Sequence, residues 1–147
     1  MQGDLGSLQN VFRAVTFAAK KHARERRKDP ERTPYINHPL GLVSILLQHG
    51  VSDTDVLQAA LLHDTVEDTD TTFEELQQEF GQEVMEIVRE CTDDKMLSKA
   101  DRKRLQVETA PHKSDKVFIF AFMVDEFSCI YRRSWSRWRI NCTIFGI

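Results

Sequence analysis

The sequence lacks the features of a disulfide-bonded, membrane-spanning or nucleic-acid-binding protein. It has three cysteines, an odd number with no CxxC pair, which indicates neither a disulfide framework nor a cysteine-type zinc site. The longest apolar run, residues 117–124, is too short to cross a bilayer. A net charge of −3 offers no general attraction to nucleic acid or to membrane surfaces. We therefore expect a cytoplasmic protein without nucleic-acid or membrane partners, whose protein partners are unknown.

The length and composition are those of one globular domain. The 147 residues are 41% apolar and 29% charged, and no repeat or low-complexity linker divides them. After Lys116 an apolar run is followed by a mixture of tryptophan and arginine between residues 131 and 139. We assign residues 1–116 to the domain and residues 117–147 to a divergent tail of uncertain structure. An alternative terminus explains this tail better than a nucleic-acid-binding patch does.

Helical periodicity dominates the first 107 residues and predicts an all-α fold. Apolar residues recur at three- and four-residue steps, and the alternation typical of strands is absent. Ser7 is expected to cap the first helix, and Asp53 or Thr54 the third. Thr72 and Glu75 form a capping box that opens the fourth. The expected helices cover residues 7–26, 39–49, 54–62, 73–80, 84–91 and 98–107.

A charged loop is expected between the first two helices. Residues 24–34 carry five cationic side chains and two prolines, and proline breaks a helix. The ordinary interpretation of such a run is a solvated loop. Its position just before His38 favours a second interpretation, in which the cations bind phosphate.

The run from His63 to Asp68 places an imidazole and three carboxylates directly after an apolar helix. Buried charge is costly unless it is paired or binds a cation. On a continuous helix, the four-residue spacing would stack His63 on Glu67 and Asp64 on Asp68. A lone histidine at this place would more often be structural, but the cluster predicts a metal site. His38 is expected to add a ligand by tertiary packing.

Two segments resemble the HD-type hydrolase domain of RelA/SpoT proteins, including the small stand-alone animal members. The first is Arg27-Lys28 followed by Thr33-Pro34-Tyr35-Ile36-Asn37-His38-Pro39, and the second covers residues 59–69. The resemblance, over about residues 8–116, implies an all-α HD-domain helical bundle whose C-terminal part is incomplete here. It also implies a Mn²⁺-dependent pyrophosphohydrolase that removes the 3′-diphosphate from guanosine 3′,5′-bis(diphosphate) (ppGpp). The animal members are further linked to NADPH phosphatase activity.

The resemblance implies a role for each matched residue. His38, His63 and Asp64 match metal ligands, and Glu67 and Asp68 match the catalytic acids. An imidazole and carboxylate set suits Mn²⁺, with Fe²⁺ or Zn²⁺ as alternatives. Asp68 also has a purely structural interpretation, because it stands where a helix ends.

The basic pair of the loop matches substrate-contacting residues of the same family. Arg27 offers a bidentate fork for phosphate oxygens, and Lys28 offers a point charge. The implied partner is a small phosphorylated nucleotide. Nothing in these residues distinguishes guanine from adenine, so a hydrolase for another phosphorylated nucleotide is a further alternative.

The sequence departs from the family after Lys116. A later family segment, Lys-Leu-Ala-Asp-Lys/Arg-x-x-Asn-Leu, supplies another metal-ligating aspartate, and no such segment occurs here. Asp115 and Asp125 are the candidates to replace it, and neither has the family context. We therefore expect low or absent activity. The alternative hypothesis is a non-catalytic variant that binds a nucleotide or a protein partner.

Overall fold

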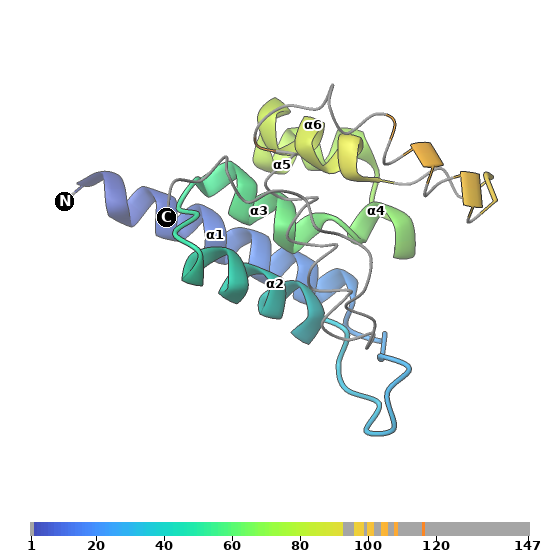
Figure 1. Ribbon diagram of the computed structural model, residues 1–147. Helices are drawn as coiled ribbons and strands as arrows, with labels where there is room; N and C mark the ends of the chain where they lie inside the picture. Colours follow the sequence, from blue (N-terminus) through green and yellow to red (C-terminus); the bar gives the residue numbers. More distant parts are fainter. Residues whose placement is uncertain are drawn as a thin grey trace.

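The computed structural model describes residues 2–92, 96–98, 100, 101, 104, 105, 108 and 116, and this part of the chain is all-α, as predicted (Figure 1). It contains no strand, and its one β-bridge joins Arg26 to Pro34. Among the same residues, no helix has the length and apolar character needed to cross a membrane. The helices are α1 (Gln2–Lys21), α2 (Asn37–Gln48), α3 (Thr54–Leu62), α4 (Thr65–Asp68), α5 (Phe73–Phe80) and α6 (Gln82–Cys91).

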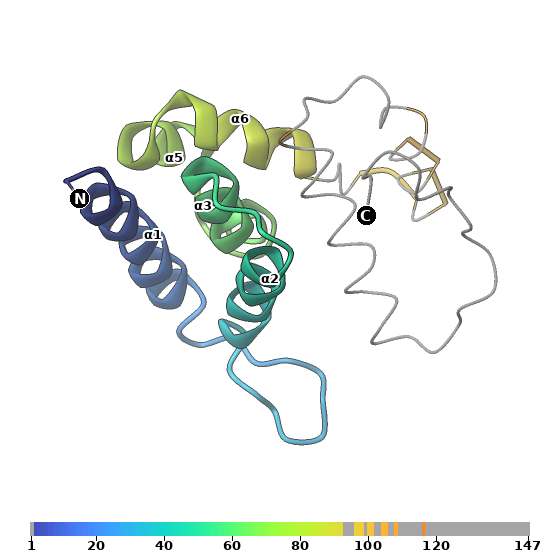
Figure 2. The same cartoon turned by 60° about the vertical axis from the view of Figure 1, so that its left-hand side comes forward.

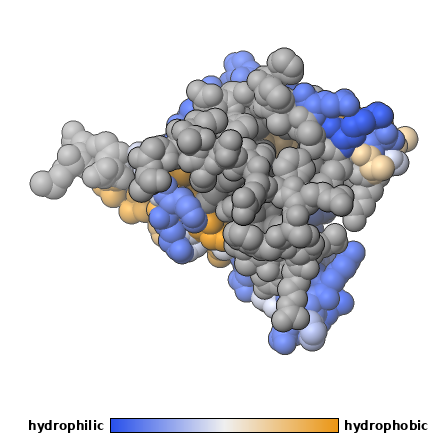
Figure 3. Space-filling view, viewed as in Figure 1, coloured by the Kyte–Doolittle hydropathy of each residue, from blue (hydrophilic) through white to orange (hydrophobic). Residues whose placement is uncertain are grey.

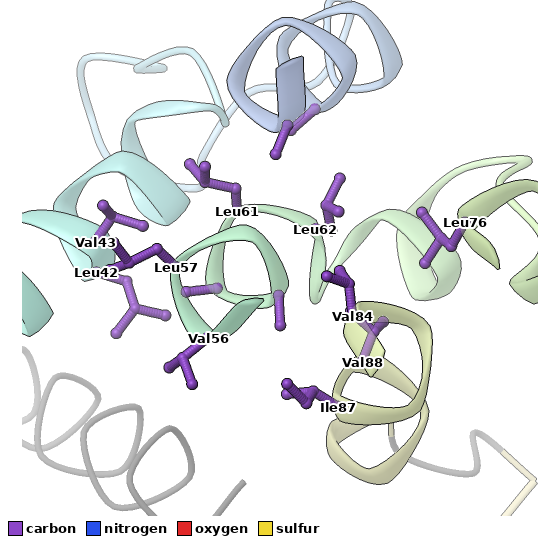
Figure 4. Close-up of a cluster of buried hydrophobic side chains, with 14 of the residues drawn as sticks. Leu42, Val43, Val56, Leu57, Leu61, Leu62, Leu76, Val84, Ile87 and Val88 are labelled. Atoms are coloured by element: carbon purple, nitrogen blue, oxygen red, sulfur yellow. The ribbon is translucent and has the colours of Figure 1, made fainter. Parts of the chain in front are cut away.

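Helix α3 is the centre of the bundle. It contacts α1, α2 and α6, and α6 in turn contacts α5, an arrangement that Figure 2 shows from the side. Every residue of α3 from Val56 to Leu62 is buried. In Figure 4 the side chains of Leu61 and Leu62 lie among those of the neighbouring helices. Burial of a leucine side chain contributes about 2 kcal/mol, so the apolar composition of α3 explains its central place.

Local sequence signals set several helix ends. Asp53 caps α3 because its Oδ1 accepts hydrogen bonds from the backbone N–H groups of Asp55 (2.9 Å) and Val56 (3.3 Å). Thr72 caps α5 by accepting from the N–H of Glu75 at 3.2 Å, as the capping box predicts. Gly81 separates α5 from α6 with a φ of 90°, which glycine adopts without steric cost.

The predicted bounds of the first helix are wrong at both ends. Helix α1 begins at Gln2, so Ser7 lies inside it and is not its cap. It ends at Lys21, before the expected residue 26. The chain beyond it folds back on itself: the N–H of Arg27 donates to the carbonyl of Thr33 (2.8 Å), and that of Tyr35 to the carbonyl of Glu25 (3.2 Å). These cross-loop bonds hold residues 25–27 against residues 33–35, so this part of the chain does not continue α1. In Figure 3 this loop, at the bottom of the view, is hydrophilic.

Helix α3 has the predicted bounds, and the charged run after it does not continue it as one regular helix. His63 and Asp64 form a turn between α3 and α4, although both keep right-handed helical dihedral angles. The hydroxyl of Thr65 donates to the carbonyl of Leu62 at 2.7 Å. That bond occupies a carbonyl that a regular helix would offer to a later N–H group. Figure 1 accordingly shows α4 as a separate helix after α3.

Some sequence predictions fall largely outside the described residues. In the expected sixth helix, the N–H of Asp101 donates to Ser98 Oγ at 3.1 Å, which is a capping bond. Most other residues of that helix, residues 117–147, Asp115 and Asp125 lie outside the described part. The division into a domain (1–116) and a tail (117–147) therefore stays a prediction.

Candidate metal centre

Three side chains converge where the start of α2 lies beside the end of α3. His38 lies in the first turn of α2, and His63 and Asp64 form the turn after α3. Asp64 Oδ2 lies 3.0 Å from His63 Nε2 and 3.6 Å from His38 Nε2. One ligand atom from each residue lies within 4.8 Å of those of the other two. These side chains, which we call the triad, are 11–18% exposed, so the tertiary fold brings together residues 25 positions apart in a mostly buried site.

The electrostatics of the triad are dominated by the pairing of His63 with Asp64. Burial opposes protonation of His63, but the adjacent carboxylate of Asp64 outweighs it and raises the pKa of this imidazole. Burial also opposes ionisation of Asp64, but His63 and a hydrogen bond from Tyr35 hold the pKa of this carboxyl well below its usual range. Asp64 is therefore a carboxylate at neutral pH, and His63 carries a proton more readily than an ordinary histidine.

The third member of the triad behaves differently. Burial lowers the pKa of His38 to about 4, and Asp64 only partly offsets this effect. His38 is thus a neutral imidazole at pH 7. In His63, Nδ1 lies 2.9 Å from the carbonyl oxygen of Ala60, to which it donates, so Nε2 is the nitrogen that faces Asp64. Both imidazoles can therefore direct Nε2 at a shared ligand.

The two predicted catalytic acids lie beside the triad. Glu67 and Asp68 belong to α4, one turn beyond His63 and Asp64, and the N–H of Asp68 donates to the carbonyl of Asp64 at 2.9 Å. Glu67 is half-buried, and its carboxylate helps to raise the pKa of His63. Asp68 is exposed, and its carboxylate helps to raise the pKa of the Tyr35 hydroxyl.

Of the predicted basic pair, only Arg27 interacts with the triad. The side chain of Arg27 is 25% exposed, and its Nε lies 3.9 Å from Asp29 Oδ2. The positive charge of Arg27 helps to lower the pKa of His38. Lys28 is exposed on the loop. No hydrogen bond or ion pair joins Lys28 to the triad among the residues that the structure describes.

Sequence reasoning missed two residues next to the triad. The hydroxyl of Tyr35 donates to Asp64 Oδ2 at 2.7 Å. The ring of His22, only 2% exposed, lies against the Tyr35 ring with centroids 4.7 Å apart. Tyr35 stands inside the motif that carries the family resemblance, so its position three residues before His38 was the available signal. His22, which follows the end of α1, gave none beyond its place in the apolar periodicity of the expected first helix.

A bundle of α-helices around a buried histidine–aspartate pair defines the all-α domains of HD type. The chain belongs to the HD domain family, which matches residues 14–119. Hydrolases of this family bind a divalent metal, and the two imidazoles and one carboxylate of the triad are a donor set that fits such an ion.

The sequence of this chain is also similar to those of individual family members. The chain is 64% identical over 107 residues to the guanosine-3′,5′-bis(diphosphate) 3′-pyrophosphohydrolase MESH1 of Xenopus tropicalis, covering 72% of this chain and 60% of the relative. It is 61% identical over 105 residues to the human protein of the same name, covering 71% and 59%. The chain thus spans about 60% of the length of these curated relatives.

A solved structure shares the fold. It is described as "A metazoan ortholog of SpoT hydrolyzes ppGpp and plays a role in starvation responses". The TM-score is 0.75 at 42% sequence identity, and the similarity covers 83% of this chain and 70% of that one.

Proposed function

We propose that this chain is a divalent-metal-dependent pyrophosphohydrolase of the RelA/SpoT type, which removes the 3′-diphosphate from ppGpp with Mn²⁺ as its metal. The observation that carries the proposal is the buried triad of His38, His63 and Asp64, with two further carboxylates one turn away. Two relatives that are more than 60% identical are named for this activity, which supports this choice of substrate.

The residues divide the work as follows. The triad would hold the metal, which when bound lowers the pKa of a coordinated water and polarises a phosphoryl oxygen. Glu67 is the better placed acid, because it is half-buried and close enough to His63 to affect its pKa; it orients the attacking water or takes its proton. Asp68 is a second acid at the exposed edge. Arg27 binds phosphate oxygens through its planar fork, and Lys28 adds a charge from the loop.

The test is Mn²⁺-dependent release of pyrophosphate from ppGpp by the purified chain. Glu67→Gln keeps the shape of the side chain but cannot accept the proton, so a loss of about 10²- to 10⁴-fold is expected. His63→Ala should abolish release. Glu79→Gln is the matched control, since Glu79 is an exposed carboxylate on α5 that pairs with Arg13. Release that is equal in Glu67→Gln, His63→Ala and the unmodified chain would contradict the assignment.

A second candidate is a non-catalytic variant that binds the nucleotide without cleaving it. One observation favours it: the sequence lacks the Lys-Leu-Ala-Asp segment that the family resemblance places after the described helices. Calorimetric titration separates the two candidates. Nucleotide binding without release of pyrophosphate supports the binding variant, whereas tight, stoichiometric Mn²⁺ binding with release supports the hydrolase. NADPH, assayed for phosphate release under the same conditions, tests the alternative substrate.

A further inference from the structure

Tyr35 occupies an unusual position between the first helix, the basic loop and the triad. Its N–H donates to the carbonyl of Glu25 at 3.2 Å, which ties it to the start of the loop. Its carbonyl accepts from the N–H of His38 at 2.9 Å, which ties it to the first turn of α2. Its ring lies edge-on to that of His38, with centroids 5.9 Å apart. The backbone of Tyr35 is therefore fixed on both sides before its side chain makes any polar contact.

The side chain of Tyr35 ends at the carboxylate of Asp64. The hydroxyl donates to Oδ2 at 2.7 Å, and Oδ2 is the same atom that lies 3.0 Å from His63 Nε2. A carboxylate on a short side chain can rotate about its last bond, and a strong hydrogen bond to one oxygen restricts this rotation. Ligating carboxylates in metal sites are commonly held by such bonds, and loss of the partner typically weakens metal binding 10- to 100-fold.

The ring of His22 supports Tyr35 from behind. The two rings lie 4.7 Å apart at 35°, and His22 Nδ1 lies 2.9 Å from Glu25 Oε2. His22 Nε2 is buried and has no hydrogen-bond partner among the residues that the structure describes. His22 therefore contributes to this region through ring packing and through the contact that holds Glu25, whose carbonyl in turn accepts from Tyr35.

We propose that Tyr35 is a positioning residue for the metal centre: its hydroxyl orients the Asp64 carboxylate for metal binding, and His22 holds the Tyr35 ring in place. This inference rests on the proposed function, because it assumes that Asp64 is a metal ligand. The proposal assigns Tyr35 no contact with the substrate. An aspartate carboxylate oxygen can only accept a hydrogen bond, so the Tyr35 hydroxyl is the donor in this contact.

Tyr35→Phe in the full chain is the direct test, since it removes one oxygen and keeps the ring. We expect Mn²⁺ affinity, measured by calorimetry, to fall 10- to 100-fold, and the electron paramagnetic resonance spectrum of bound Mn²⁺ to change. A merely structural role would instead lower the thermal stability of the metal-free chain and leave that spectrum unchanged. Thr16→Val is the control, because Thr16 lies on the exposed face of α1 and its hydroxyl donates to the carbonyl of Phe12, away from the triad.

The outcomes separate this inference from the proposed function. If the unmodified chain binds Mn²⁺ and Tyr35→Phe binds it within threefold as tightly, the positioning role is overturned and the metal centre stands. If the unmodified chain binds no Mn²⁺, the proposed metal centre fails, and the inference fails with it.

The part played by His22 is tested by combining variants. His22→Leu keeps much of the side-chain volume but removes the ring and the contact with Glu25. It should weaken Mn²⁺ binding less than Tyr35→Phe does, and the double variant should bind no more weakly than Tyr35→Phe alone, because both changes act through the same hydrogen bond. Losses that add fully in the double variant would overturn the role of His22.

Discussion

At the scale of single residues, the contrast between the two imidazoles of the triad has a measurable consequence. Metal binding requires neutral imidazoles. The pKa of His38 is about 4, so this residue has no proton to lose at pH 7, whereas His63 has a raised pKa and holds a proton more readily than an ordinary histidine. Mn²⁺ binding near neutral pH should therefore release a proton from His63 alone, and affinity should fall as pH drops below the pKa of His63. Calorimetry in buffers of different ionisation enthalpy measures this release.

The control for this prediction is an exposed histidine. His49 follows α2 with its ring near the carbonyl of Ile45, and His49→Gln should leave both proton release and pH dependence unchanged. Release of two protons at pH 7, or an affinity that does not change between pH 8 and pH 6, would contradict the assignment of these pKa shifts.

The sequence and the family motif predicted that the three triad residues lie together, but not which residues contact them. His38, His63 and Asp64 were expected together, because a polar cluster after an apolar helix must be compensated and the family motif supplies a distant histidine. Tyr35 and His22 were missed, because their contacts depend on how the loop folds back between α1 and α2. A tyrosine and a histidine with no periodic pattern between them give no sequence signal of a ring contact.

At the scale of helices, two glycines with different backbone conformations give a matched pair of predictions. Gly6 lies inside α1, where an added Cβ meets no atom within 4 Å, so Gly6→Ala should stabilise the protein by about 0.5–1 kcal/mol. Gly81 also has open space, but its φ of 90° disfavours other residues, and Gly81→Ala should cost about 1–3 kcal/mol. Urea unfolding measures both, and a destabilised Gly6→Ala or a neutral Gly81→Ala would contradict the respective prediction.

The cap of α3 yields a prediction that depends on pH. Asp53→Ala removes the acceptor for the N–H groups of Asp55 and Val56 and should cost about 1 kcal/mol. Burial opposes the ionisation of Asp53, but these N–H groups and Lys116, 3.3 Å away, give it a lowered pKa. The part of the advantage of Asp53 over alanine that depends on its charge should therefore be complete above about pH 4 and be lost as pH falls further, whereas a protonated carboxyl keeps a capping oxygen.

Asparagine separates the two contributions of Asp53. Asp53→Asn keeps a capping oxygen but loses the charge that faces Lys116, so it should cost only a few tenths of a kcal/mol, as expected for an exposed ion pair. Urea unfolding at pH 7 and pH 3 measures both variants. A cost of Asp53→Ala that is the same at the two pH values would show that ionisation of Asp53 plays no part.

Helix boundaries illustrate why periodicity is a better guide to the presence of an element than to its ends. All helices expected between residues 39 and 91 are present, because their apolar faces pack against α3 or against a helix that does. The end of α1 and the separate short helix α4 were not foreseen. The first depends on hydrogen bonds across a loop, and the second on the hydroxyl of Thr65. Neither bond has a periodic signature.

At the scale of the whole molecule, the triad links two helices that are otherwise held together by apolar packing. A ligand that binds only the folded state at 100 times its dissociation constant adds about 2.7 kcal/mol to the free energy of unfolding. For a domain of this size the expected rise in melting temperature is roughly 10 °C. Thermal unfolding followed by circular dichroism over a range of Mn²⁺ concentrations measures this stabilisation.

Two aspartates make the thermal test specific. Asp64→Asn should remove the Mn²⁺-dependent rise, because it deletes the charge at the centre of the triad. Asp70→Asn should keep it, because Asp70 is an exposed carboxylate that pairs with Lys21, away from the triad. If Mn²⁺ raises the melting temperature of Asp64→Asn as much as that of the unmodified chain, the ion acts on the general charge of the protein and not at the triad. The apolar packing around α3 would then account alone for the stability of the bundle, and the buried carboxylate of Asp64 would depend on Tyr35 and His63 for its compensation.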